Sequence, residues 1–230
     1  VLMSCSEDRT IRQWGLRTDE GDDTGHHDGH QDEVNAVVVC RNGRLVLSCA
    51  DDGTALVWDA ALGRLWRQFK VGARVRHGTV DALCGVVAVA DAAGVHVFHT
   101  TTETELRWET PGLDIRGIKI SAPTAGVYTL FVTGMLGSKA VARLYDVNTQ
   151  GFEIQQCQRG GDVAVVSEVV CGDMDEAGTR MAVGCRDRCI RVYSAASLEI
   201  EAVLEADQPV RGLCMDATGT FIASHGTASV

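Results

Sequence analysis

The 230-residue sequence has little proline, few aromatic residues and no excess of basic charge. It holds 3 Pro, 5% aromatic residues, and 21 Lys and Arg against 31 Asp and Glu, for a formal net charge of −10. Proteins that bind nucleic acid or anionic membranes present basic patches, so this balance argues against both classes. No apolar run reaches the roughly 18 residues of a membrane-spanning helix. The chain begins at Val1 without a secretory signal pattern, and we expect it to be a fragment.

The nine cysteines lack a disulfide or metal-ligand pattern. They are scattered, form no C-x-x-C pair, and mostly lie in apolar runs such as AVVVCR and LVLSCA. Disulfide scaffolds favour short chains and even counts, and zinc sites favour closely spaced ligand pairs. A free thiol in an apolar run behaves as a small hydrophobic residue. We therefore expect free thiols and an intracellular, reducing location, either cytoplasm or nucleus.

One pattern recurs along the chain: an apolar run, a short turn, and alternating residues that end on an aromatic. These aromatic residues are Trp14, Trp58, Phe98, Tyr145 and Tyr193, separated by 44, 40, 47 and 48 residues. In the first, second and fifth copies an Asp lies six residues before the aromatic. A further copy begins in PVRGLCMDATGTFIAS near the end of the chain.

Within each copy the apolar residues alternate with a period of two. Val34, Ala36 and Val38 alternate with other residues ahead of a turn at 41–43. Short alternating runs bounded by Gly, Asp and Asn predict antiparallel strands. Four strands repeated every roughly 40–45 residues are typical of propeller blades. The sequence therefore predicts an all-β fold, a β-propeller of four-stranded antiparallel blades.

Residues 29–59 carry a family resemblance. Gly29-His30, VNAVVV, the turn at Asn42-Gly43, LVLSCADDGT and Trp58-Asp59 resemble one nearly complete WD repeat, the tryptophan–aspartate unit of β-propellers. Weaker copies cover most of the chain, although only Trp58-Asp59 keeps the dipeptide. The resemblance implies one propeller region, 1–230, with four full blades and two partial ones. Their limits are about 29–70, 71–110, 111–158 and 159–206 for the full blades, and 1–28 and 207–230 for the partial ones.

The number of blades indicates whether the sequence contains a whole propeller ring. At roughly 42 residues per blade, a closed ring of six or seven blades needs about 250–300 residues. We therefore expect a fragment of such a ring, in which the first piece supplies second and third strands and the last piece supplies first and second strands.

Four residues of the strong copy invite two interpretations. Ser, His and Asp are the residue types of a catalytic triad. The WD-repeat resemblance instead implies that His30, Ser48, Asp52 and Trp58 form a structural hydrogen-bond network. No G-x-S-x-G motif accompanies Ser48, so we favour the structural interpretation and expect neither catalysis nor a cofactor. The corresponding turn and aromatic pairs in other copies are Asp8 with Trp14 and Asp187 with Tyr193.

Two further clusters suggest chemistry. Segment 19–32, DEGDDTGHHDGHQD, combines His26, His27 and His30 with Asp22, Asp23 and Asp28, residue types that bind transition metals. Blocks of like charge usually stay solvated, so we favour an acidic loop without a metal. Cys185 and Cys189 are close in sequence, but Cys189 occupies the position of Thr10 and Thr54, which indicates packing.

The resemblance also implies where partners bind. In the family, these positions cluster where the first strand of a blade begins and the second turns into the third. Mapped onto this chain they are Glu7, Glu33, Asn35, Asp51, Glu168, Arg186 and Arg211. Four of the seven are carboxylates, which favours a basic peptide or protein surface as the partner. We expect a non-catalytic protein–protein interaction scaffold.

Three alternatives remain. Leu2–Arg17 is similar to the box that docks WD-repeat substrate receptors onto cullin ubiquitin ligases, although Gly15 stands where that box has an acidic residue. A propeller enzyme and a metal-binding module are the others. The oligomeric state stays open.

Overall fold

The computed structural model describes residues 2–14, 23–41, 43–82, 85–102, 104–124, 127–148, 153–156, 162–163 and 165–226. Regular structure in these residues consists of β-strands, arranged in antiparallel sheets whose neighbours follow chain order. The all-β fold with four-stranded antiparallel sheets is therefore confirmed. Among these same residues there is no helix that is long and apolar enough to cross a membrane. The chain divides into two compact units, Val1–Glu109 and Thr110–Val230, and each is described by itself.

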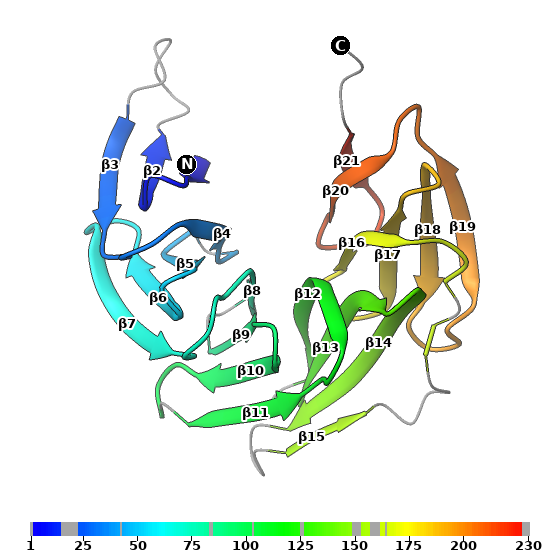
Figure 1. Ribbon diagram of the computed structural model, residues 1–230, viewed down its shortest axis with the longest axis horizontal. Helices are drawn as coiled ribbons and strands as arrows, with labels where there is room; N and C mark the ends of the chain where they lie inside the picture. The colour runs from blue at the N-terminus through cyan, green and yellow to red at the C-terminus, as the bar shows by residue number, and fades with distance from the viewer. Residues whose placement is uncertain are drawn as a thin grey trace. The chain divides into compact units, whose positions relative to one another are not determined.

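The first unit contains three sheets (Figure 1). The first sheet consists of β1 (Leu2–Cys5), β2 (Thr10–Trp14) and β3 (Asp23–Asp28). The second consists of β4 (Val34–Val39), β5 (Leu45–Ala50), β6 (Thr54–Asp59) and β7 (Arg64–Lys70). The third consists of β8 (His77–Val80), β9 (Val86–Ala90), β10 (Gly94–His99) and β11 (Glu105–Glu109).

The second unit contains two four-stranded sheets and a two-stranded one. One sheet consists of β12 (Leu113–Thr124), β13 (Val127–Leu136), β14 (Lys139–Asn148) and β15 (Glu153–Gln156). The next consists of β16 (Val169–Met174), β17 (Arg180–Cys185), β18 (Cys189–Ser194) and β19 (Ile200–Glu205). The last pairs β20 (Val210–Met215) with β21 (Ile222–Gly226).

The middle strands of each sheet form the core. Every residue of β9 is buried, and so are five of the six residues of β5 and of β10. Between the second and third sheets, Phe69 stacks on Phe98 with ring centroids 4.6 Å apart. Strands covered on both faces read as continuous apolar runs instead of alternating ones, which explains VVAVA in β9. The described core therefore lies between stacked sheets.

The turns that join β1 to β2, β5 to β6 and β17 to β18 have the same conformation. The residue that follows the turn aspartate has positive φ each time: Arg9 (70°), Gly53 (75°) and Arg188 (66°). The aspartate accepts a hydrogen bond from the backbone N–H two residues further on, and this geometry defines an Asx turn. The repeated Asp position that the sequence shows therefore corresponds to one repeated turn.

Two expectations are wrong. Residues 23–28, which we expected in a solvated loop, form β3 and pair with β2 in the register Thr10↔Asp28 and Ile11↔His27. Pairing needs only backbone groups, and an outermost strand does not have to bury its side chains, so polar composition did not prevent it. The first piece thus supplies three strands instead of two.

The second wrong expectation concerns the thiols. Six described cysteines are free, but Cys40 is disulfide-bonded. The turn residue Asn42 and the motif residues Gly15, Leu16, Arg17 and Asp22 lie outside the described residues.

Candidate partner-binding face

His30, Ser48, Asp52 and Trp58 are joined in one hydrogen-bonded chain. The Trp58 indole N–H donates to Ser48 Oγ over 2.8 Å, and His30 Nε2 lies 2.8 Å from the same oxygen. The other ring nitrogen, His30 Nδ1, lies 2.9 Å from Asp52 Oδ2. Three strands or their flanking turns supply these side chains: His30 precedes β4, Ser48 lies on β5 and Trp58 on β6. The network therefore links consecutive strands of one sheet.

Asp52 is held by several further donors. Its carboxylate accepts hydrogen bonds from the backbone N–H of Gln31 (2.8 Å) and from the Thr54 backbone N–H (2.9 Å) and hydroxyl (2.6 Å). Burial favours the protonated form, but the donors Thr54, Gln31 and His30 outweigh it and lower the pKa of Asp52. Ser48 is fully buried and His30 is 6% exposed, so no exposed nucleophile results.

The first sheet repeats part of this arrangement. The Trp14 indole N–H donates to Ser4 Oγ over 2.9 Å, as Trp58 does to Ser48. Asp8 accepts from the Thr10 hydroxyl and from Arg12, whose guanidinium lies 3.1 Å away.

The sheet β16–β19 uses a different partner for its turn aspartate. Arg191 donates to both carboxylate oxygens of Asp187, over 3.2 and 2.6 Å, and this pair lowers the pKa of Asp187. Tyr193 is buried on the same strand. The structure thus pairs Asp187 with an arginine on β18, the strand that follows its turn, instead of with a histidine.

Sequence reasoning missed a corresponding cluster in the third sheet. His96 on β10 is 1% exposed, with Asp91 3.4 Å from one ring nitrogen and Glu105 2.9 Å from the other. Asp91 accepts the backbone N–H of Gly94 over 2.8 Å. Asp91 lies seven residues before Phe98. A search that allowed this extra turn residue could have found it.

The candidate partner-binding positions lie at one end of their sheets. We call this end the turn face: the residues just before or at the start of β4, β12, β16 and β20, together with the β1–β2, β5–β6 and β17–β18 turns. In the first unit a backbone hydrogen bond joins the β5–β6 turn to the residue before β4: the Asp51 N–H donates to the Glu33 carbonyl over 2.9 Å. Arg186 N–H makes the equivalent bond to the Glu168 carbonyl, also over 2.9 Å, in the second unit.

A β-bulge marks the first strand at this face. Four of the described first strands carry it, and the bulged residues are Asn35, Arg116, Val170 and Arg211. A bulge re-aims the side chain of the extra residue and interrupts the ladder. The sequence gave no signal for the bulges, because the apolar alternation continues on both sides of them.

Two of the bulged residues reach the neighbouring sheet of their own unit. The Asn35 amide donates to Asp51 over 2.7 Å and to the carbonyl of Val75 over 3.0 Å. Arg116 donates to Glu168 over 2.7 Å and to the carbonyl of Val169 over 2.8 Å. The accepting valines are buried: Val75 lies in the connection between β7 and β8, and Val169 is the first residue of β16. The turn face therefore also links each sheet to the segment that begins the next one.

Charges on the turn face are partly neutralised. Glu168 pairs with Arg116 and with Arg186 (3.0 Å), and these partners lower the pKa of Glu168. Asp51 lies 3.3 Å from the guanidinium of Arg74. Glu7, Glu33 and Arg211 are exposed. Of the four carboxylates, Glu7 and Glu33 are thus the two that present the most solvent-exposed charge.

Comparison with known proteins identifies a repeat in one segment of the chain. The model of the WD domain, G-beta repeat, matches residues 21–59, the segment that contains the His30–Trp58 network. Residues 21–59 therefore match one WD repeat. A ribosome biogenesis protein WDR12 homolog from Chlamydomonas reinhardtii is 33% identical over 73 residues, 29% of this chain and 16% of that relative. Small ribosomal subunit protein RACK1 from Drosophila melanogaster is 34% identical over 64 residues, 28% of this chain and 20% of that relative.

A third relative extends the comparison to plants. Small ribosomal subunit protein RACK1y from Oryza sativa subsp. japonica is 35% identical over 78 residues, which cover 32% of this chain and 21% of the relative. The matched segments therefore span about a fifth of the length of these WD-repeat relatives.

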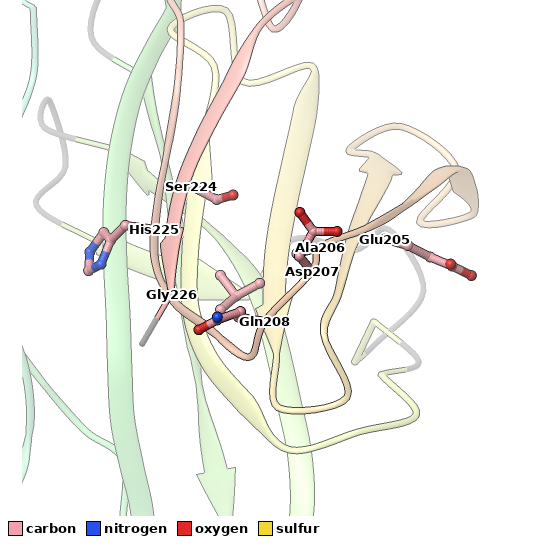
Figure 2. Close-up of a pocket in the computed structure, with 8 residues that line it drawn as sticks. Glu205, Ala206, Asp207, Gln208, Ser224, His225 and Gly226 are labelled. Atoms are coloured by element: carbon pink, nitrogen blue, oxygen red, sulfur yellow. The ribbon is translucent and has the colours of Figure 1, made fainter. Parts of the chain in front are cut away.

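One hollow lies in the second unit. It has a volume of about 470 Å³ and lies between the β19–β20 linker, Glu205–Gln208, and β21. Figure 2 shows the side chains of Glu205 and His225 pointing in opposite directions, so these two groups do not meet in the hollow. Among the described residues, no group of three or more His, Cys, Asp or Glu side chains could hold a metal ion.

Cys171 and Cys185 of the second unit do not suit redox chemistry. Burial raises the pKa of both Cys171 and Cys185 to about 11, so both stay protonated thiols at neutral pH. The Cys189 backbone N–H donates to Asp187 as Thr54 does to Asp52, so this residue continues the turn.

Proposed function

We propose that the chain is a non-catalytic scaffold that presents its turn face to partner proteins. The observation that carries this is the recurrence of one construction in both units: a bulged first strand and a hydrogen-bonded turn that fix charged side chains at one end of the sheets. Binding residues held by rigid strands and short turns are preorganised, which lowers the entropy cost of association. The WD-repeat match of residues 21–59 supports the same role.

A basic partner segment fits the first unit best. Glu7 and Glu33 are exposed carboxylates, and complementary potential steers association with basic segments. The turn face of the second unit carries Arg186 and Arg211, so it favours acidic side chains of a partner. The partner is therefore proposed to be a protein with a basic segment.

The cellular location and the alternative functions are considered next to this proposal. The relatives are named as ribosomal or ribosome-biogenesis proteins, which supports a location in the cytoplasm or nucleus. No specific observation favours the cullin-docking box, since Asp8 and Trp14 are engaged within their own sheet. The buried, hydrogen-bonded Ser48 gives no support to a serine hydrolase.

The experiment is a quantitative comparison of co-purified partners. The full-length protein is expressed in its source cells as wild type, as Glu7→Lys/Glu33→Lys, and as the control Glu109→Lys, which changes an exposed carboxylate on the outer strand β11. We expect the turn-face variant to lose most partner signal, by about tenfold or more, and the control to keep it. Equal partner recovery from all three proteins would contradict the proposal.

A further inference from the structure

Two outermost strands expose large apolar side chains. On β7, the edge strand of its sheet, Leu65 is 47% exposed and Trp66 is 37% exposed. On β19, the edge strand of its own sheet, Val203 is 51% exposed and Leu204 is 44% exposed. An edge strand with exposed apolar residues offers unpaired backbone groups and apolar area together, and this combination marks a site of strand association.

These two strands have opposite charge. β7 reads RLWRQFK, with Arg64, Arg67 and Lys70 and no acidic residue. The segment 199–205 reads EIEAVLE, with three glutamates and no basic residue. The outer strand β11 differs from both, because ELRWE carries the two signs together. Among β7, β11 and β19, only β7 and β19 thus carry complementary single-sign charge.

An antiparallel alignment of 64–70 with 199–205 matches the two segments along their length. It places Arg64 opposite Glu205 and Lys70 opposite Glu199, while Leu65 faces Leu204 and Trp66 faces Val203. The four terminal charges are all exposed. Figure 2 shows the Glu205 side chain extending away from β21. Opposite charges and apolar pairs across antiparallel strands each stabilise such pairing.

Interactions within each sheet limit how β7 and β19 can pair with another strand. The Arg67 guanidinium lies 5.2 Å from the Trp66 ring centroid and donates to the carbonyl of Thr100, which holds the indole in place. Glu201 pairs with Arg180 over 2.9 Å. Trp66 and Glu201 are also bulged residues, and bulges on edge strands shorten the ladder that a second strand can add. Side chains must therefore supply most of the attraction.

We propose that β7 of one copy binds β19 of a second copy of this chain. The two surfaces are different, so the contact is heterologous and can repeat from copy to copy. It uses the outer strands and leaves the turn face available, and it is independent of the function proposed above. The charged ends make the association dependent on ionic strength.

Sedimentation velocity of the purified chain measures this association. The weight-average sedimentation coefficient is expected to rise with protein concentration at about 0.05 M salt and to lose most of that rise at about 0.5 M. A coefficient that stays constant over the accessible concentration range at low salt would overturn the proposal.

Two charge-reversed variants identify the surfaces. In Arg64→Glu/Lys70→Glu both strands are acidic, and in Glu199→Lys/Glu205→Lys both are basic. Each variant alone is expected to associate at least about tenfold more weakly than wild type, and an equimolar mixture is expected to associate again. The control Arg107→Glu/Glu109→Lys on β11 keeps its charge balance and is expected to behave as wild type.

The mixture distinguishes this contact from others. Association through other strand edges, or through the turn face, would survive in each variant alone and would gain nothing on mixing, and that result would overturn the proposal. Val203→Thr keeps a β-branched side chain on β19 and serves as a second variant if charge reversal prevents folding. It is expected to weaken association several-fold, and an unchanged value would count against the proposal.

Discussion

At the scale of single residues, Ser48 shows why the same three residue types can serve structure instead of catalysis. Its oxygen accepts the Trp58 N–H and contacts His30, and all three side chains are buried. A catalytic serine must be exposed and oriented toward a substrate. Here the hydroxyl is used entirely to satisfy buried groups.

Replacing Ser48 with Ala tests this role. The change leaves the Trp58 N–H and a His30 nitrogen without their partner in the core, so we expect a loss of about 3 kcal/mol in the free energy of unfolding. Urea unfolding followed by tryptophan fluorescence measures it. Ser224→Ala, at an exposed position on β21, should change stability by less than about 0.5 kcal/mol. Similar small losses in both variants would contradict the network.

Asp52 gives a prediction for pH dependence. Its pKa is lower in the folded chain than the value of about 3.9 in an unfolded one, so its contribution to stability is present above about pH 4. That contribution is lost as the pH falls through the folded-state pKa. The stability difference between wild type and Asp52→Asn should therefore shrink as the pH is lowered from about 5 toward 3. Unfolding midpoints in urea measure the difference, and a difference independent of pH would contradict the assignment.

The sequence predicted the role of some residues of the turns and missed the role of others. The Asp turn was visible because its conformation needs a specific side chain at a fixed distance from the aromatic. Arg191 and Arg12 were not recognised as partners of the turn aspartates, since an arginine on a strand reads as an ordinary solvated charge. The His96 cluster was not predicted, because its aspartate, Asp91, lies seven residues before the aromatic Phe98 instead of six.

At the scale of strands, close backbone approach explains individual glycines. A Cβ added to Gly94, at the start of β10, would lie 2.0 Å from the carbonyl oxygen of Trp108 on β11. Backbone cannot move aside there without breaking the β10–β11 ladder.

Gly94→Ala should therefore cost about 2–3 kcal/mol of stability, as overpacking of a close contact does. The matched control is Gly43→Asn, at a turn position with φ of 67° and no atom within 4 Å of the added Cβ. Asn tolerates this conformation, so the control should cost well under about 1 kcal/mol. Thermal unfolding of the two variants measures both. A larger loss at Gly43 than at Gly94 would be inconsistent with the described packing.

One carboxylate joins three first strands of the second unit. Asp173 on β16 accepts the Met215 backbone N–H of β20 over 2.8 Å and lies 3.1 Å from the ammonium of Lys119 on β12. No sequence pattern predicted this link, because it depends on which strands the fold brings together.

Hydrogen exchange tests the link. In Asp173→Ala the Met215 amide loses its acceptor, and its exchange should become about tenfold faster or more. The backbone amide of Val192, which lies within β18, provides the internal control and should exchange at the wild-type rate. Unchanged protection at Met215 would show that Asp173 does not hold β20.

At the scale of the whole chain, repetition made the fold predictable. Each sheet repeats one pattern of apolar runs and turns, so errors in single elements did not change the fold class. Polar outer strands such as β3 could not be predicted, because they bury little and show no apolar alternation. The sequence also could not predict which turn-face carboxylates are paired with arginines, because those partners are neighbours only in the folded structure. Glu7 and Glu33 are the exposed carboxylates of that face.

Hydrogen exchange of the full-length protein, free and bound to a co-purified partner, tests the central claim most directly. The account predicts that protection on binding concentrates on the turn face, at residues 31–36 and 51–54 of the first unit and 186–188 of the second. Protection confined to the outer strands β7, β11 and β19, with an unchanged turn face, would contradict it.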